Sequence, residues 1–215
     1  MHVPFFIYII IFSTFAGLYS QYVKKSSALY LKLFPIFLVL TILVELGAVW
    51  MIKIEKRHDT YLIYNPFTCF EFVFYIFIIS EIIRKKAAKK ILFGLMVAYP
   101  IVVAINVFFF QGIHKFHSFT YSIGCLVIVG CCIYYFYELF LLPHSVNLLR
   151  QPPFWICTAL LFFYAFTYPV YGLSNLMSGL SDRVAIILAR ILDSLNILLY
   201  SFFSIAFLCR LRIRK

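Results

Sequence analysis

The stretch LFPIFLVLTILVELGAVWMI, from Leu33 to Ile52, contains a single charged side chain, Glu45. An α-helix rises about 1.5 Å per residue, so a helix over this stretch is long enough to cross the hydrocarbon core of a membrane, which is roughly 30 Å thick. A charge inside such a helix costs about 2.5–3.5 kcal/mol and usually faces a partner, a cavity or a ligand. The stretch therefore predicts a membrane-spanning helix that carries part of a polar site.

The composition extends this prediction to the whole chain. Of the 215 residues, 64% are hydrophobic and only 13% are charged, far from the balance of a soluble domain. Apolar runs recur along the sequence with short connections, and no connection is long enough for an extramembrane domain. We predict an all-α, polytopic bundle that forms one transmembrane domain over residues 1–215 and contacts the lipid bilayer.

Seven apolar runs are candidate transmembrane helices. They cover residues 3–20, 33–52, 66–83, 91–110, 118–142, 153–173 and 184–209. The first run lacks a positively charged start and a small-residue cleavage site, so we interpret it as a retained helix and not as a signal peptide.

The positive charges predict the orientation of these helices. The net charge is +11, and the lysines and arginines gather at the ends of the apolar runs, so they indicate topology and no nucleic-acid partner. Thirteen of them fall on the side of the C-terminus, while five fall on the opposite side. Because positive residues concentrate in cytoplasmic loops, we expect the N-terminus outside and the C-terminus in the cytoplasm, in the cell inner (plasma) membrane.

With this orientation, several polar side chains fall at one depth. Glu45, Glu71, Asn106, Arg190 and Asp193 all lie in the outer half of their predicted helices. Each would be costly against lipid and far less costly inside the bundle. Three carboxylates against one guanidinium leave an excess of negative charge, which calls for protonation or for a cation. The sequence therefore predicts a polar pocket open to the outside.

Helical spacing extends the candidate site. Arg190, Asp193 and Tyr200 fit one stripe of the last helix with Asn196 beside it, and tyrosines 164, 168 and 171 recur along the sixth helix. A structural ion pair between Arg190 and Asp193 is the alternative interpretation for these two residues. The predicted ligand-binding residues are Glu45, Glu71, Tyr75, Asn106, Tyr168, Arg190, Asp193, Asn196 and Tyr200.

Other site chemistry has little support in the sequence. The six cysteines lie in or beside apolar runs without paired spacing, which is typical of small buried thiols. His114 and His117 have a spacing that could bring two imidazoles to one metal, but both lie in a predicted loop and no second motif points to them. We therefore expect no metal, no cofactor and no catalytic nucleophile.

Three segments resemble a group of small bacterial seven-helix membrane proteins of unknown function, some of them similar to the sensing part of a signalling system. The segments are YNPFTCFEFVFY (64–75), PPFWICTALLFFY (152–164) and NILLYSFFSIAFLC (196–209). The resemblance implies a sensor-like role, and it singles out Glu71 and Asn196 as the residues that match.

Three functions fit these features. The first is a receptor or sensor that binds protons or a small polar or cationic ligand and signals to a separate cytoplasmic protein. The second is a small-solute transporter, because the first three and last three helices would share one orientation, as in parallel repeats. The third is a lipid-modifying enzyme that uses paired carboxylates as acid and base. We favour the first over an enzymatic role, and the transporter and the enzyme stay open as alternatives.

Overall fold

A computed structural model describes residues 4–23, 28–55, 59–141, 147–172, 182–209 and 211. Some of the charges that predict the orientation lie outside these residues: Lys24, Lys25, Lys56, Arg57, Arg210, Arg212, Arg214 and Lys215. The described part of the chain is all-helical, and seven of its helices are long and apolar enough to cross a membrane. The seven predicted helices are thereby confirmed, and their length and composition are compatible with a multi-pass membrane bundle.

The helices follow one another as α1 (Phe5–Val23), α2 (Leu29–Lys53), α3 (Tyr61–Ile82), α4 (Lys86–Ile105), α5 (Ser118–Phe140), α6 (Pro152–Gly172) and α7 (Asp182–Leu208). A π-helical turn, η1 (Asn106–Gln111), extends α4, and a short 3-10 turn, η2 (Leu148–Arg150), precedes α6.

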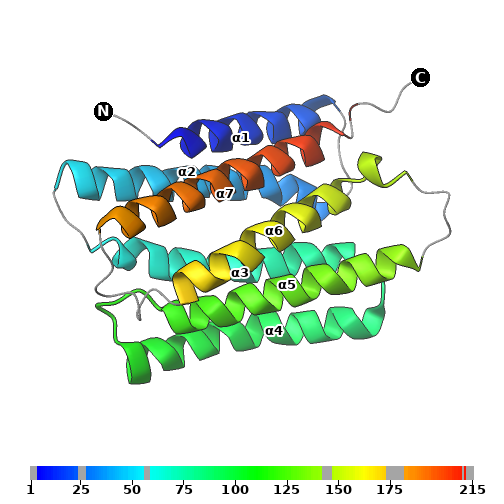
Figure 1. Ribbon diagram of the computed structural model, residues 1–215. Helices are drawn as coiled ribbons and strands as arrows, with labels where there is room; N and C mark the ends of the chain where they lie inside the picture. Colours follow the sequence, from blue (N-terminus) through cyan, green and yellow to red (C-terminus); the bar gives the residue numbers. More distant parts are fainter. Residues whose placement is uncertain are drawn as a thin grey trace.

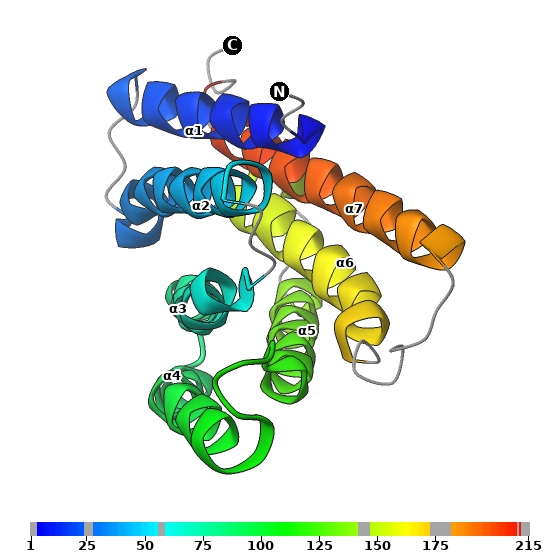
Figure 2. The ribbon, with the colours of Figure 1, turned by 90° about the vertical axis from the view of Figure 1, so that its left-hand side faces the viewer.

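The helices run up and down in a single bundle (Figure 1). α1 packs against α2 and α7, α6 packs between α5 and α7, and α3 contacts α2, α4 and α5. Seen along the bundle, α4 lies outside α3 and α5, at the edge of the group (Figure 2). We call the end where α2 finishes and α3 begins the pocket end, and the end where α3 finishes and α4 begins the basic end.

Several helices are longer than predicted, and the reason is local. α3 begins at Tyr61, five residues before the predicted start at Pro66, because the Asn65-Pro66 pair is accommodated inside the helix instead of starting it. α4 begins at Lys86 because its first turn is made of lysines and alanines, which favour a helix although the lysines interrupt the apolar run. Hydropathy thus locates the apolar part of each helix but not the residues at which the helix begins and ends.

Phenylalanine rings fill the half of the bundle nearest the basic end. Phe34 of α2 is fully buried, and its ring centre lies 4.8 Å from that of Phe203, 5.5 Å from Phe207 and 5.7 Å from Phe74. Phe37 stacks on Phe74 at 4.2 Å. We call these five residues the phenylalanine cluster, and they hold α2, α3 and α7 together.

Close approach to α5 depends on one glycine. A Cβ atom at Gly124 would lie 2.8 Å from the Phe72 ring of α3. Phe72 is itself fully buried among Tyr99, Tyr121 and Tyr164, so its ring has no free space to move into. The contact between α3 and α5 therefore requires a residue without a side chain at this position.

Candidate functional site

A cavity of about 490 Å³ lies in the pocket-end half of the bundle. Its lining comes from α2, α3, α5, α6 and α7, together with residues just before α3 and α5. The lining residues are Glu45, Thr60, Tyr61, Tyr64, Phe67, Thr68, Glu71, Phe116, Tyr121, Phe163, Tyr171, Leu192, Asn196 and Tyr200. Volumes of 300–1,000 Å³ are typical of small-molecule sites, so the cavity has the size of a binding pocket.

One face of α3 supplies the polar wall. Tyr61, Tyr64, Thr68 and Glu71 lie three or four residues apart, so a helix brings all four to one side, and all four line the cavity. Thr68 donates its hydroxyl hydrogen to the carbonyl of Tyr64 at 2.8 Å, which satisfies the side chain within its own helix. The stripe explains why α3 must begin at Tyr61 for the site to form.

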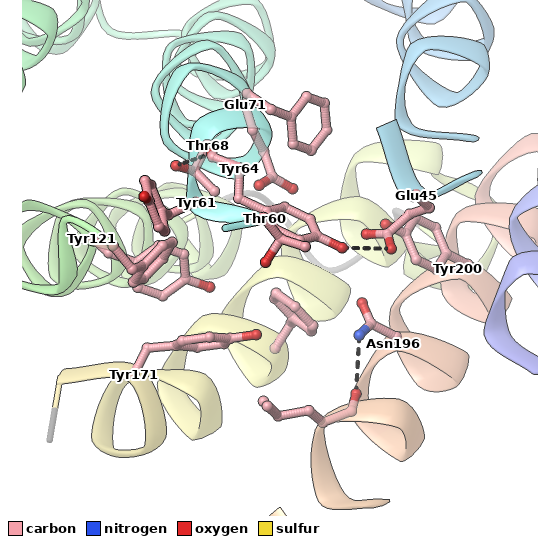
Figure 3. Close-up of a pocket in the computed structure, with 14 residues that line it drawn as sticks. Glu45, Thr60, Tyr61, Tyr64, Thr68, Glu71, Tyr121, Tyr171, Asn196 and Tyr200 are labelled. Carbon is pink, nitrogen blue, oxygen red and sulfur yellow. Dashed lines mark hydrogen bonds between the residues drawn. The ribbon is translucent and has the colours of Figure 1, made fainter. Parts of the chain in front are cut away.

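Two carboxylates reach the cavity from different helices. Glu45 of α2 accepts a hydrogen bond of 3.0 Å from the hydroxyl of Tyr64 on α3 (Figure 3). Glu71 of α3 points into the same space and interacts electrostatically with Glu45. The cavity thus brings together two acids that are 26 residues apart in the sequence, as the shared depth predicted.

Two tyrosine hydroxyls below the cavity add unused hydrogen-bonding capacity. Tyr75 and Tyr164 are completely buried, and each interacts with Glu71. Within the described residues, neither hydroxyl oxygen has a partner at ordinary hydrogen-bond geometry. Unpaired buried polar groups are costly. The floor of the site therefore places two phenol hydroxyls beside the Glu71 carboxylate.

Aromatic rings form the opposite side of the cavity. Tyr121 of α5 and Tyr171 of α6 have ring centres 4.8 Å apart, and Phe116 lies 5.5 Å from the first and 5.6 Å from the second. We call these three residues the aromatic corner. In Figure 3, Tyr121 and Tyr171 lie across the cavity from Glu45 and Tyr200. A ligand would meet carboxylates on one side and ring faces on the other.

His117 fixes the rim of the cavity just before α5. Its Nε2 atom lies 2.8 Å from the Thr68 hydroxyl and 3.1 Å from the carbonyl of Asn65, and its Nδ1 atom lies 2.7 Å from the Thr120 hydroxyl. Since a carbonyl can only accept, Nε2 carries the hydrogen. Burial lowers the pKa of His117, against smaller opposing contributions from backbone hydrogen bonds. His117 is thus a neutral side chain that links α3 to the start of α5 by hydrogen bonds.

The structure groups five of the predicted site residues. Glu45, Glu71, Asn196 and Tyr200 line the cavity, and Tyr75 lies beneath it beside Glu71. Asp193 interacts electrostatically with Glu45 but is exposed and does not belong to the lining.

Three predicted residues lie elsewhere, which corrects the expected grouping. Asn106 is buried in the π-helical turn, where its amide donates to Gln111 at 2.6 Å and to Thr120 at 3.5 Å. Tyr168 is 39% exposed on the outer face of α6, because the residues that face inward are Tyr164 and Tyr171, which lie seven residues or about two turns apart. Arg190 is exposed in a groove of α7 with Ile187 and Ser194.

The register of α7 explains the displacement of Arg190. Leu192, Asn196 and Tyr200 are the α7 residues that line the cavity, at intervals of four. Arg190 lies two residues before Leu192, which is roughly half a helical turn around the axis. The predicted stripe through Arg190, Asp193 and Tyr200 was chosen from the charged residues of α7. The side of α7 that faces the cavity is instead the one that contains Asn196.

Apart from Tyr200, and Tyr171 in the tyrosine repeat of the sixth helix, the aromatic lining was not predicted from the sequence. Tyr61, Tyr64 and Phe116 fell in predicted loops, and Tyr121 and Phe163 lie in predicted helices where no polar pattern marks the inward face. The signal that could have found the first two is the repeat of polar side chains at positions 61, 64, 68 and 71. Tyr121 lies at the pocket end of α5, apart from Tyr134, Tyr135 and Tyr137, but no local pattern shows that its side chain faces inward.

No protein-family model, no curated protein and no solved structure matches this chain. The resemblance of its three segments to sensor-like proteins therefore stays a prediction, and the function is argued from the cavity.

Proposed function

We propose that the chain is a multi-pass protein of the plasma membrane whose cavity binds a small organic cation, as a receptor or sensor does. The observation that carries this proposal is the joint presence of two carboxylates and eight aromatic side chains in one cavity, with no lysine or arginine among its described lining residues.

Electrostatics favour a positively charged ligand. Two carboxylates that interact across a cavity between apolar helices repel each other, and the repulsion is stronger in a medium of low dielectric constant than in water. A cation between Glu45 and Glu71 would relieve this repulsion and replace the water that each acid loses. Protons could do the same, so proton binding is the simplest competing event at this site.

The aromatic lining favours an organic cation over a metal ion. Ring faces of tyrosine and phenylalanine attract ammonium groups, contributing about 0.5–2 kcal/mol each. The aromatic corner would also cover an apolar part of the ligand, while the hydroxyls of Tyr75 and Tyr164 remain available near Glu71. An amine with a short hydrocarbon or ring body fits this combination of groups.

The predicted topology supports access from outside. Lys85, Lys86, Lys89 and Lys90 lie at the basic end, and the positive-inside rule assigns that end to the cytoplasm. The cavity would then open toward the exterior, where an extracellular ligand could enter without crossing the membrane. Labelling of a single cysteine introduced next to Lys115 in intact cells tests the orientation.

The experiment that tests the function measures melting temperature and direct binding of the detergent-purified protein with choline, ethanolamine, spermidine and a neutral analogue of each. We expect at least one cation to stabilise the wild type and its neutral analogue to have no effect. Glu71→Gln and Glu45→Gln should abolish the shift. Glu81→Gln is the matched control, because Glu81 is an exposed residue of the same α3 helix outside the cavity.

Two results would contradict the proposal. One is that no cation in the panel binds at millimolar concentration between pH 5 and pH 8. The other is that a cation binds equally to wild type, Glu45→Gln and Glu71→Gln, which would locate its site elsewhere.

Transport is the second candidate, and one observation favours it. The cavity is lined by α2 and α3 on one side and by α5, α6 and α7 on the other, so it lies between the two groups of helices that would share an orientation. Sites between repeats are typical of transporters. Counterflow of a bound cation in liposomes separates the two functions, since a receptor binds without flux.

A further inference from the structure

A second feature of the bundle lies at its basic end, far from the cavity. Arg84 and Lys85, which connect α3 to α4, line a cleft of about 380 Å³ together with Tyr134, Tyr137 and Glu138 from the end of α5. Arg84 and Lys85 are exposed, and the two tyrosine rings lie 6.2 Å apart. The cleft therefore presents cations and phenol groups to whatever enters it.

The acidic residue in this cleft has a structural role. The carboxylate of Glu138 accepts hydrogen bonds from the backbone N–H of Arg84 at 2.9 Å and of Lys85 at 3.1 Å. Both oxygens thus face the backbone at the start of α4, where a negative charge is favourable. The carboxylate fixes the α3–α4 connection, and the side chains of Arg84 and Lys85 extend from that fixed backbone.

An apolar groove continues from the cleft along the bundle. It has a volume of about 290 Å³ and lies between α4 and α5, with Leu92 and Leu95 on one wall and Leu126 and Gly130 on the other. Tyr134 borders both the groove and the cleft. The groove is open at Gly130, where a Cβ atom would have no contact within 4 Å outside the backbone of its own helix.

We propose that the cleft and the groove together bind an anionic phospholipid. The phosphate and headgroup would lie between Arg84 and Lys85 with hydrogen bonds from Tyr134 and Tyr137, and one acyl chain would fill the groove. From Lys85 to Leu95 a helix rises roughly 15 Å, which is about half the hydrocarbon thickness and so the length of one leaflet. From the basic end inward, the charged cleft comes before the apolar groove. The headgroup and the acyl chain of a phospholipid follow in the same order.

Charge and shape together select this occupant. A zwitterionic lipid would place its own cation among Arg84 and Lys85, while a soluble anion would leave the groove empty. The proposal requires that the helices cross a membrane, but it does not depend on the ligand of the cavity.

The first test compares phosphatidylglycerol with phosphatidylcholine of the same acyl chains, by native mass spectrometry and melting temperature of the detergent-purified full chain. We expect phosphatidylglycerol to bind more tightly and to raise the melting temperature more. Arg84→Gln with Lys85→Gln should weaken phosphatidylglycerol binding about tenfold or more, since each basic residue near a lipid surface contributes about 1 kcal/mol. Lys86→Gln with Lys90→Gln is the control of equal charge, because both residues are exposed and line neither feature.

The second test probes the groove without changing charge. Gly130→Leu would fill the groove, while Gly94→Leu adds the same side chain to α4 at a position that also has open space and does not line it. We expect Gly130→Leu to reduce phosphatidylglycerol binding and Gly94→Leu to leave it unchanged.

Three outcomes would overturn the lipid site. The first is equal binding of the two lipids, and the second is an equal loss of phosphatidylglycerol binding in the Arg84/Lys85 and the Lys86/Lys90 double variants. The third is that Gly130→Leu binds phosphatidylglycerol as tightly as the wild type. Because these measurements contain no free amine or choline from the cavity panel, and the expected binder, phosphatidylglycerol, carries no cation, their failure is distinct from failure of the cavity proposal. Conversely, the lipid measurements can give the expected result whether or not the wild type binds a cation of the cavity panel.

Discussion

The two halves of the bundle are both built from aromatic residues, yet they use them differently. Near the basic end, the phenylalanine cluster packs ring against ring with no space between α2, α3 and α7. Near the pocket end, tyrosines 64, 121, 171 and 200 surround a cavity of about 490 Å³. The phenylalanine half fills its interior with hydrocarbon, whereas the tyrosine half leaves room and points hydroxyls toward it.

This difference separates stability from binding. Dense ring packing contributes dispersion and fixes the helices, so the phenylalanine half holds the bundle together. A cavity with buried acids and unpaired hydroxyls is costly to form, so the tyrosine half relies on the rest of the fold. Substitutions in the first half should therefore change the free energy of unfolding, and substitutions in the second should change ligand affinity.

The strongest test of this comparison is Phe34→Ala. Phe34 is fully buried, and its ring contacts the four other members of the phenylalanine cluster and the ring of Tyr75. We expect the substitution to lower the free energy of unfolding by about 3–5 kcal/mol, because it removes a large side chain and leaves a void. Denaturant unfolding in detergent measures the change.

Phe93→Ala is the control for that experiment, since Phe93 of α4 is 66% exposed. Equal losses in the two variants would mean that the phenylalanine cluster is not the stabilising half, and the comparison would fail.

The next largest effect is expected from Gly124→Leu, at the boundary between the two halves. A side chain there would collide with the Phe72 ring, whose own neighbours prevent it from moving. Overpacking of this kind costs about 1–3 kcal/mol. Thermal unfolding should show the loss for Gly124→Leu but not for Gly130→Leu, which lies on the same helix in open space. A stable Gly124→Leu protein would show that α3 and α5 can separate without penalty.

The sequence could predict the number of helices and part of the site, and the reasons differ. Long apolar runs can satisfy their backbone only as helices, so hydropathy finds them. Glu45 and Glu71 could be placed together because depth follows from counting residues along a helix. The rotation of each helix about its axis could not be found in this way, because almost every residue is apolar and no polar face marks the inside.

Particular residues show the limit. Arg190 and Tyr168 were predicted inside from charge and spacing, yet both lie on outward faces, and Asn106 bonds to Gln111 instead of the cavity. Tyr121 enters the site only because Gly124 lets α5 approach Phe72. That approach is a packing result between helices distant in the sequence, and no local pattern encodes it.

A smaller, pH-dependent effect should come from His117 at the rim of the tyrosine half. Burial lowers its pKa from the usual 6.5, so below that pH the unfolded chain takes up a proton that the folded protein excludes. Stability from this residue is therefore complete above pH 6.5 and falls as the pH decreases, by up to about 1.4 kcal/mol per unit. Melting temperatures from pH 8 to pH 5 should decline less in His117→Gln than in the wild type. Parallel curves of melting temperature against pH would show that the imidazole is not held in its neutral form between α3 and α5.

Tyr64→Phe sharpens the comparison inside the tyrosine half. It removes one hydroxyl that donates to Glu45 and leaves the ring in place. A hydrogen bond to a charged group contributes about 1.5–3 kcal/mol, but water in the cavity can replace it here, so we expect a stability change of about 1 kcal/mol or less. Cation affinity, measured by titration calorimetry, should change by a larger factor than stability. The reverse order would place Tyr64 among the residues that hold the fold.

The smallest expected effect distinguishes the two faces of α7. Asp193 interacts electrostatically with Glu45 but does not line the cavity. Asp193→Asn should therefore weaken cation binding by only about threefold. Glu45→Gln and Glu71→Gln, by contrast, should abolish cation binding. Arg190→Gln, on the exposed groove, should leave binding unchanged. If Asp193→Asn removes binding as completely as Glu71→Gln does, the ligand reaches beyond the lining described for α7. The excess negative charge would then belong to three acids, and the cavity would be one part of a wider site that extends to the outer surface of that helix.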